Sequence, residues 1–345
     1  MNTKFPILTL EGSHEEIGYQ MGKKLKERII SALNFYKTLF NSEEKKIFEE
    51  LKVFKEAIKQ NYPQYVEEIE NIARGADLDP QWIYALNSRS ELMTNLNNLK
   101  VHECTAITLK EEGLSGQNWD WSKELEPLAV ILRIKNTKTM NNILMMTEPG
   151  IIGKIGLNGY GLGVCLNFMH GGTKHLAGVP VHVILRAILD SSNIDEALKL
   201  VSKTYKGKEA NILISDANGH SIDVEFYDQK QFITEITSDS YIHTNHYTKE
   251  KIIAPGQDES SSRARYQMAT DILKHKKLTT INDIKDLLAN RDNPTLPICR
   301  KYVPDPLIKN VGTVCTIIID HRHLKMHITR GNPFDNKFDE IPLVI

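Results

Sequence analysis

Cys104 is the residue of this sequence whose surroundings most directly suggest covalent chemistry. It opens an apolar, strand-like run in the segment "VHECTAITL" at 101–109. A cysteine that serves only in packing usually lies inside a strand or helix, as Cys165 and Cys315 do in their apolar runs. We expect a cysteine at the entrance of a strand to be exposed enough to react.

Four polar residues at the ends of other strand-like runs are candidate partners of this cysteine. They are Asp120 in "GQNWDW", Asn167 in "CLNF", Asn245 in "HTNH" and Arg300 in "ICR". A cysteine nucleophile needs a base and an oxyanion hole. Side-chain amides together with backbone N–H groups can form such a hole. The set therefore suggests nucleophilic acyl chemistry.

Two other interpretations of these residues stay open at this point. In the first, a histidine is the base, since His102, His170 and His243 are available. In the second, Cys104 is a buried thiol, the asparagines cap turns, and the acid and the arginine form an ordinary ion pair. Spacing alone slightly favours this packing interpretation.

The glycines of "GLNGYGLG" at 156–163 do not form a dinucleotide-binding fingerprint. Val164 stands where the third glycine of G-x-G-x-x-G is required, and the run leads into a strand instead of a helix. An Asn-Gly hairpin turn explains these glycines better. We therefore expect no nucleotide cofactor.

The histidines make a weak case for a metal site. His243 and His246 lack an H-E-x-x-H frame, and His321, His323 and His327 straddle an expected hairpin turn. Polar histidines are common at turns and strand edges. We expect no metal and no other cofactor, but a metal-dependent hydrolase built on the His321 group remains an alternative.

Composition and charge restrict the class of protein. The chain has 345 residues, 41% hydrophobic and 25% charged, which is ordinary for a soluble globular protein with a sizeable core. A formal net charge of -1 and the lack of a basic stripe argue against nucleic acid or anionic lipid as a partner.

The N-terminus lacks a signal-peptide core, and no apolar run approaches the length of a membrane span. Four cysteines without paired spacing fit a reducing compartment, so we expect a cytoplasmic protein.

The first hundred residues are predicted to be helical. Ser13 and Glu16 form a capping box ahead of an apolar stripe that recurs at helical spacing as far as Tyr36. Further helices are expected over about 43–60, after Pro63, and from Asp79 and Pro80 onward.

After residue 100, short strands are predicted to alternate with turns. The expected strands cover 104–109, 128–135, 142–147, 151–157 and 161–167, with a hairpin over 211–227 and a strand pair around "HRHL". Helices are expected over 179–190, 194–203 and 280–290, and the polar stretch 256–265 is expected to be a surface loop that leads into a helix. This pattern favours a sheet sandwich with helices outside, preceded by an integrated helical segment.

At these residues the chain resembles the acyl-CoA:6-aminopenicillanic acid acyltransferase (isopenicillin N acyltransferase) family, peptidase family C45 of the N-terminal-nucleophile (Ntn) hydrolases. "ECTAI" is similar to the segment that holds the nucleophilic cysteine of that family, and "LSGQNWDW" to the strand that follows it. "TEPGIIGKIGLNGYGLGV" resembles the glycine-rich signature of the family. "GVPVHVILRAILDSSN", "HTNH" and "ICR" then follow in the family's order, so the resemblance covers about residues 100–320.

The resemblance implies an α+β fold, a four-layer αββα sandwich with a helical N-terminal segment. It also implies an inactive precursor that cuts its own chain before the nucleophile, here between Glu103 and Cys104. The chain would then consist of a helical segment 1–103, the α chain, and a catalytic core 104–345, the β chain, which stay associated. The fungal penicillin acyltransferase has glycine where this chain has Glu103. Glycine adopts the strained backbone of an N→S acyl shift at less cost than glutamate does.

The resemblance also assigns a role to each candidate site residue. Cys104 would be both the self-cleavage residue and the nucleophile, and its freed α-amine would be the general base. Asp120 would hold the new ammonium, and Asn245 would donate its amide to the tetrahedral oxyanion. Asn167 matches a position that helps form the same hole in the related bile-salt hydrolases. Arg300 matches an arginine that pairs with the acid or approaches the substrate.

We therefore expect a cysteine Ntn enzyme that cleaves or exchanges a linear amide through a thioester on Cys104. Its partner would be a small-molecule amide or acyl thioester. Hydrolysis and acyl transfer share the thioester and differ only in whether water or an amine resolves it. A non-catalytic binding protein on the same scaffold is the alternative.

Overall fold

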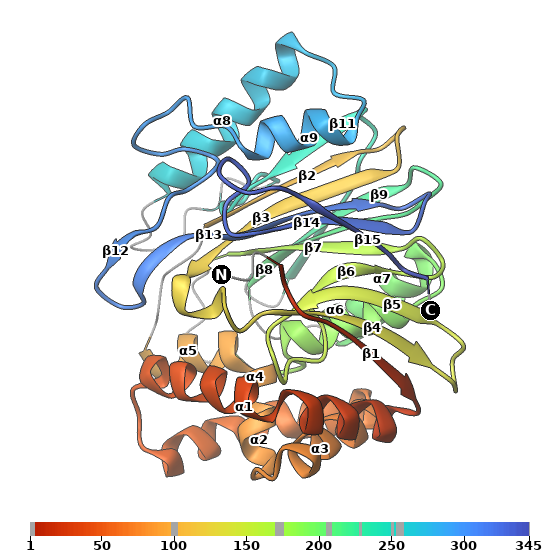
Figure 1. The fold of residues 1–345 in the computed structure, drawn as a ribbon, viewed down its shortest axis with the longest axis vertical. Helices are drawn as coiled ribbons and strands as arrows, with labels where there is room; N and C mark the ends of the chain where they lie inside the picture. Colours follow the sequence, from red (N-terminus) through yellow and green to blue (C-terminus); the bar gives the residue numbers. More distant parts are fainter. Residues whose placement is uncertain are drawn as a thin grey trace.

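Two stacked β-sheets form the centre of the molecule, and helices cover their outer faces (Figure 1). The computed structural model describes residues 4–97, 103–169, 176–204, 209–227, 230–249, 252 and 259–344. The order of layers is helix, sheet, sheet, helix. The predicted α+β fold with an αββα arrangement is confirmed.

Within the described residues, the first sheet has eight strands in the order β1-β4-β5-β6-β7-β8-β9-β10. Their bounds are Ile7–Gly12 (β1), Val130–Asn136 (β4), Asn142–Thr147 (β5), Ile155–Asn158 (β6), Gly163–Phe168 (β7), Ala210–Ser215 (β8), Ser221–Tyr227 (β9) and Lys230–Glu235 (β10). Neighbouring strands are antiparallel, except that β1 runs parallel to β4. The N-terminal segment, predicted to be helical, thus also contributes a strand to this sheet.

The second sheet has the order β11-β2-β3-β13-β14-β15, and β12 pairs with β13. The bounds are Ser240–His243 (β11), Glu103–Leu109 (β2), Leu114–Ser122 (β3), Lys309–Asp320 (β13), Lys325–Arg330 (β14), Asp339–Pro342 (β15) and Val303–Asp305 (β12). Cys104 lies opposite Trp119 of β3, which in turn lies opposite Cys315 of β13. These three residues belong to the main core, whereas Ile107 and Leu109 pack in a second core with the helices Ser260–His275 (α8) and Ile281–Leu288 (α9).

The helices of the first hundred residues follow the predicted pattern. They are His14–Phe40 (α1), Glu44–Asn61 (α2), Pro63–Ala76 (α3), Pro80–Asn87 (α4) and Arg89–Asn97 (α5). Ser13 and Glu16 form the predicted capping box, and the Asp79 side chain accepts a hydrogen bond from Gln81 N. The apolar stripe of α1 is buried throughout.

Four more helices lie in the described part of the chain after residue 104. They are Val181–Asp190 (α6), Ile194–Thr204 (α7), Ser260–His275 (α8) and Ile281–Leu288 (α9). The surface loop expected over 256–265 is wrong in its second half, because α8 begins at Ser260. Three serines start this helix, and its buried face is too polar for an apolar periodicity to reveal.

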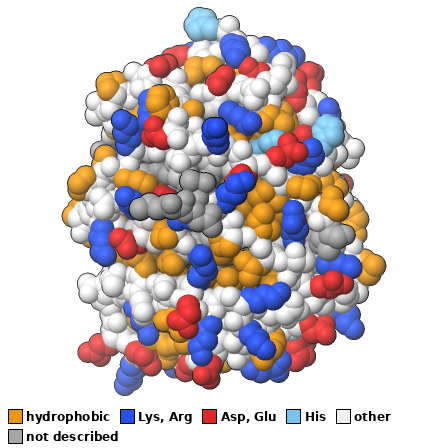
Figure 2. Space-filling view, in the orientation of Figure 1, with side chains coloured by type: hydrophobic (Ala, Val, Ile, Leu, Met, Phe, Trp, Pro, Cys, Tyr) orange, Lys and Arg blue, Asp and Glu red, His pale blue; other side chains and the backbone are white. Residues whose placement is uncertain are grey.

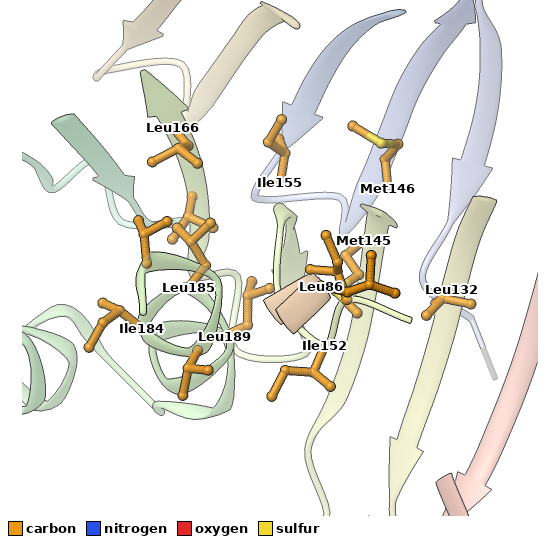
Figure 3. Close-up of a cluster of buried hydrophobic side chains, with 14 of the residues drawn as sticks. Leu86, Leu132, Met145, Met146, Ile152, Ile155, Leu166, Ile184, Leu185 and Leu189 are labelled. Carbon is orange, nitrogen blue, oxygen red and sulfur yellow. The ribbon is translucent and has the colours of Figure 1, made fainter. Parts of the chain in front are cut away.

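One apolar core joins the N-terminal helices to the sheets. Figure 3 shows Leu86 of α4 beside Met145 of β5 and Ile152, with Leu185 of α6 close by. The same core contains residues from both sides of the predicted Glu103–Cys104 cut. The division into 1–103 and 104–345 stays a prediction, but either piece alone would expose much of this core to water.

The surface carries charges of both signs. On the face shown in Figure 2, Lys and Arg side chains and Asp and Glu side chains are scattered among hydrophobic and uncharged areas. This distribution agrees with the formal net charge of -1. Among the described residues, no helix has the length and apolar character that crossing a membrane requires.

Helices α1 and α3 approach each other closely at glycine residues. A Cβ atom added at Gly22 would lie 2.1 Å from the Ile72 carbonyl oxygen, and one at Gly75 would lie 2.3 Å from the Tyr19 carbonyl oxygen. Both obstacles are backbone atoms, which cannot move aside as a flexible side chain does. Glycine at these positions therefore sets the distance between the two helices.

We expect Gly22→Ala to lower the free energy of unfolding by about 1–3 kcal/mol, because the extra methyl group overpacks the helix interface. Urea titration followed by circular dichroism measures this. Gly159→Ala is the control, since a Cβ there has no neighbour closer than 3.7 Å. Its expected change is within about 0.5 kcal/mol. Equal stability of the two variants would contradict the close packing of α1 on α3.

Candidate active site

Cys104 lies at the start of β2, with its side chain facing the core between the two sheets. Only 4% of the residue is exposed. The exposure that its place at a strand entrance suggested is therefore wrong for the uncut chain. Pairing with Trp119 of β3 directs the side chain inward, so it packs in the core although it opens the strand.

Asn245 holds the peptide nitrogen of Cys104. His243 pairs with Ala106 where β11 ends, and two further residues along each strand bring Asn245 opposite Cys104. Here a side chain supplies the acceptor that a backbone carbonyl supplies elsewhere in the strand pair. Oδ1 of Asn245 accepts a hydrogen bond from Cys104 N at 2.7 Å. Nδ2 of Asn245 donates to the carbonyl of Phe168 on β7 at 2.9 Å. One carboxamide thus connects the two sheets at Cys104.

Arg265 of α8 holds the carbonyl side of the same residue. Its Nη1 donates to Cys104 O at 2.5 Å and to Thr105 Oγ1 at 2.9 Å, and its Nη2 donates to Asn245 Oδ1 at 2.9 Å. The side chain is fully buried. Sequence reasoning missed this residue because "SSSRAR" reads as a polar loop. The helical spacing of Ser262, Arg265 and Ala269, all buried on one face of α8, is the signal that could have found it.

Arg300, the arginine predicted for the site, is bonded to Thr313 through its backbone. Its backbone N donates to Thr313 Oγ1 at 3.0 Å, and its carbonyl accepts from Thr313 N at 3.2 Å. Thr313 lies opposite Asp120 in the β3–β13 pair, so Arg300 lies one strand away from the predicted acid. Pairing of the two side chains stays a prediction. The arginine that hydrogen-bonds Cys104 is Arg265.

Asn167 lies beside Asn245 at the end of β7. Its Nδ2 donates to the His243 carbonyl at 3.5 Å, a long hydrogen bond, and its Oδ1 accepts from Asn211 Nδ2 at 3.4 Å. Asn245 contacts the next residue of β7, Phe168. The structure therefore brings the two predicted asparagines to the same end of β7.

Gln117 connects the same two sheets close to Cys104. It lies opposite Ala106 and so on the same face of the sheet as Cys104. Its Oε1 accepts from Leu166 N at 2.6 Å, and its Nε2 donates to Leu166 O at 3.1 Å. Two side-chain amides, of Gln117 and Asn245, thus fix β7 against the second sheet.

The thiol of Cys104 is held in its protonated form in the uncut chain. Its pKa is raised to about 12, first by burial and then by the negative charge of Asp120. A hydrogen bond from the Asp120 backbone and the charges of Arg265 and Lys154 act in the opposite direction. Burial likewise raises the pKa of Cys165 to about 12 and that of Cys299 to about 11. The uncut chain therefore gives Cys104 no advantage in reactivity over these thiols.

The histidine trio proposed as a metal site does not come together. His321 is buried, with Nδ1 2.9 Å from the Gly161 carbonyl and Nε2 2.8 Å from Ser115 Oγ. His323 is bonded to Asp320 instead. Burial lowers the pKa of His321 to about 4, so its ring is neutral. It serves as a hydrogen-bonded link between β3 and the turn at Gly161.

Asp223, Glu225 and His243 are the group of three possible metal ligands found within the described residues. His243 Nδ1 lies 2.8 Å from the Thr244 carbonyl, which only accepts, and Nε2 lies 2.8 Å from Glu225 Oε1. Both ring nitrogens therefore donate, and neither keeps a lone pair for a metal. Burial alone would lower the pKa of His243, but the charge of Asp223 and the bond to Glu225 raise it. His243 and Glu225 therefore form a buried ion pair.

The same contacts bear on a histidine as the base for Cys104. His243 is the predicted candidate that the structure describes, while His102 and His170 lie outside the described residues. With both nitrogens engaged by Thr244 and Glu225, His243 cannot accept a thiol proton. Its role is to anchor the strand end that carries Asn245.

The sequence has clear relatives. The family model described as Acyl-coenzyme A:6-aminopenicillanic acid acyl-transferase matches residues 108–335. This chain belongs to that family. The Emericella nidulans protein "Acyl-coenzyme A:6-aminopenicillanic-acid-acyltransferase 40 kDa form" is 30% identical over 344 residues, which cover 94% of this chain and 92% of the relative. Beta-alanyl-dopamine/carcinine hydrolase of Drosophila melanogaster is 24% identical over 238 residues, 61% of this chain and 59% of that protein.

Solved structures also resemble the chain. A mutant of conjugated bile acid hydrolase from Clostridium perfringens aligns with a TM-score of 0.48 and 15% identity, over 70% of this chain and 92% of that one. Penicillin V acylase from Agrobacterium tumefaciens aligns with a TM-score of 0.46 and 14% identity, over 66% and 82%. Membership in the acyltransferase family makes this chain an enzyme of the amide hydrolase or acyltransferase kind.

The contacts of Arg265 lead to a prediction on stability. Arg265→Met should lower the free energy of unfolding by about 1.5–3 kcal/mol, since Cys104 O and Asn245 Oδ1 lose a charged donor inside the protein. Lys274→Met on the same helix is the control. The Lys274 side chain is 63% exposed and pairs with Asp271, which is 49% exposed, so its loss should change stability by at most about 0.5 kcal/mol. Denaturant titration of both variants compares them directly, and an equal effect would exclude a positioning role for Arg265.

Proposed function

We propose that the chain is a cysteine Ntn enzyme in which Cys104 attacks a linear amide, or an acyl thioester, and carries the acyl group as a thioester. The arrangement of Asn245 and Arg265 around the Cys104 backbone supports this proposal. Side chains hold both the nitrogen and the carbonyl of this one residue, although an inner strand normally uses its ladder for both. Family membership adds the enzyme class.

The first reaction proposed for Cys104 is on its own chain. The sulfur attacks the Glu103 carbonyl carbon, the C–N bond breaks, and the peptide nitrogen leaves as an amine. Water then hydrolyses the resulting thioester. This step frees the α-carboxylate of Glu103, which becomes a chain end, and the thiol of Cys104. Asn245 Oδ1 already accepts a hydrogen bond from the nitrogen that would leave. It can keep that contact when the nitrogen becomes an α-amine.

In the cut enzyme, this α-amine is the proposed general base. An unperturbed α-amine has a pKa of about 7.7–8.0, which suits proton transfer near neutral pH. With one N–H directed to Asn245 Oδ1, the amine lone pair is restricted in direction and can face the thiol of the same residue. The amine takes the thiol proton as the sulfur attacks, and returns it to the leaving amine of the substrate.

The side-chain amide of Asn245 is the proposed oxyanion donor. An NH₂ group has two hydrogens, and within the described residues Nδ2 uses one of them on Phe168 O. The second can bind the oxygen of a tetrahedral intermediate on Cys104. Asn167 of β7 lies next to Asn245, and its side-chain amide is the second proposed oxyanion donor. Asp120 and Arg300 keep their proposed roles at the new ammonium and toward the substrate.

The proposed substrates are N-acyl amino acids, small peptide-like amides, acylated amines or acyl thioesters. Each leaves the same thioester on Cys104, which water or an amine then resolves. The two pieces of the cut chain stay together, because they share one apolar core and the buried pair of Arg89 with Glu148. We also propose a cytoplasmic location, which agrees with four free cysteines.

Self-cleavage is tested by intact mass. We expect purified protein to separate under denaturing conditions into residues 1–103 and 104–345, which elute together in native gel filtration. Cys104→Ala should remain a single chain, whereas the control Cys165→Ala should be cut like the wild type. A wild-type protein that hydrolyses amides with its Glu103–Cys104 bond intact would rule out the α-amine base.

Asn245→Asp separates the two proposed tasks of Asn245. A carboxylate keeps an acceptor for Cys104 N and Arg265 but loses the N–H donor. We therefore expect turnover to fall roughly 10²–10³-fold with little change in KM, measured as amine released from a panel of N-acyl amino acids. Self-cleavage in this variant should fall less than in Asn245→Ala, which loses both contacts. Unchanged turnover in Asn245→Asp would remove Asn245 from the oxyanion hole.

A further inference from the structure

A buried lysine lies near the nucleophile and has no role in the mechanism so far. Lys154 directly precedes β6 and is 1% exposed. Its Nζ is bonded to Glu148 Oε1 and lies 3.4 Å from the centroid of the Trp119 ring. Burying a lysine is costly unless its charge is matched, as Glu148 matches it here. We therefore asked what a buried lysine contributes at this place.

The Trp119 ring links this ammonium to the part of the core that holds Cys104. Trp119 is the middle residue of the row Cys104–Trp119–Cys315, which runs across β2, β3 and β13. Directly opposite side chains in antiparallel strands have Cβ atoms about 4.5–5.5 Å apart. A cation against the Trp119 ring therefore lies on the face of the sheet that carries both cysteine side chains. Arg265, the other cation near Cys104, contacts its backbone instead.

We propose that Lys154 is a positioning residue whose ammonium stabilises the Cys104 thiolate, with Glu148 and Arg89 controlling that charge. The inference rests on Cys104 being the nucleophile, as proposed above. Lys154 makes no hydrogen bond to the sulfur, so it acts through its charge. Its effect on the thiol is favourable, since the Lys154 charge lowers the pKa of Cys104 against the effect of burial.

The groups packed around Lys154 determine its own protonation. Its pKa is lowered to about 8, first by burial, while the charge of Glu148 raises it and that of Arg89 lowers it. Burial alone would raise the pKa of Glu148, but Arg89 and Lys154 hold it well below its usual value, so Glu148 is ionised. His182, which also faces this group, is neutral, because burial lowers its pKa. The Cys315 thiol is protonated, because burial raises its pKa.

The sign of the pH effect follows from these groups. Below about pH 8, Lys154 carries its proton and attracts the thiolate. Above that pH it is neutral and the attraction is lost. Arg89 competes with Lys154 for Glu148, because its Nη2 lies 2.6 Å from the same oxygen, Oε1. Arg89 belongs to α5, so the N-terminal segment contributes to the charge state of the lysine.

A structural role for the same pair is the alternative. Tyr36 of α1 and Arg89 of α5 both hydrogen-bond Glu148, which joins the N-terminal helices to the sheets. In that case Lys154 would only neutralise Glu148. Both interpretations predict a loss of stability when Lys154 is replaced. They differ in the reactivity of the Cys104 thiol, which changes only if the lysine charge acts on it.

The test is the rate at which iodoacetamide alkylates Cys104 in the cut, folded protein, followed by peptide mapping between pH 6 and 10. Lys154→Met should slow this reaction about tenfold at pH 7, because the thiolate loses a nearby cation. Lys154→Arg should stay within about threefold of the wild type at pH 7 and exceed it at pH 9, since its charge does not titrate. Lys135→Met, which removes an exposed lysine of β4, should match the wild type.

A second variant, Lys154→Gln, separates the two interpretations even if Lys154→Met folds poorly. It removes the ammonium charge but keeps an N–H donor for Glu148, which stays paired with Arg89. Slow alkylation in Lys154→Gln supports the inference, and a wild-type rate overturns it in favour of a structural pair. If Cys104 of the cut wild-type protein labels no faster than Cys165, the proposed function fails and the inference fails with it. If Cys104 labels first but Lys154→Met has the wild-type profile, only the inference is overturned.

Discussion

The hydrogen bond between Cys104 N and Asn245 Oδ1 is the contact on which the rest of the site depends. A buried peptide N–H without an acceptor costs about 1–3 kcal/mol, and β11 ends two residues too early to supply a backbone carbonyl there. A side chain must therefore supply the acceptor. Because the same carboxamide also donates to β7, the spacing of the two sheets is fixed at this point. The paired contacts of Gln117 on Leu166 keep β7 at that distance.

The charges around Cys104 oppose one another. Asp120 disfavours the thiolate, while Arg265 and Lys154 favour it, and burial decides the outcome in the uncut chain. A thiol in this state is protonated at neutral pH and reacts slowly with external reagents. A free α-amine at Cys104 would change the balance in two ways. It adds a positive charge next to the sulfur when protonated, and a proton acceptor when neutral.

The sequence predicted elements that depend on local signals. The capping box at Ser13 and the turn at Asn158–Gly159 lie within a few residues, so their patterns are visible without the fold. Strand β1 was missed because its partner β4 is more than a hundred residues away. The order of family motifs located Cys104, Asn167 and Asn245. It did not locate Arg265, because hydropathy cannot reveal a buried face that is made of serine and arginine.

The N-terminal segment is part of the site's electrostatics as well as of its core. Glu148 is fully buried and receives hydrogen bonds from Tyr36, Arg89 and Lys154. The first two come from the piece that a cut at Cys104 would detach. Their loss would leave a buried carboxylate with one cation, and removing one partner of such a group costs several kcal/mol. The pKa of Lys154 would also rise, because the Arg89 charge that lowers it would be lost. A cut chain that keeps its first piece therefore keeps both its stability and the lowered pKa of the lysine near Cys104.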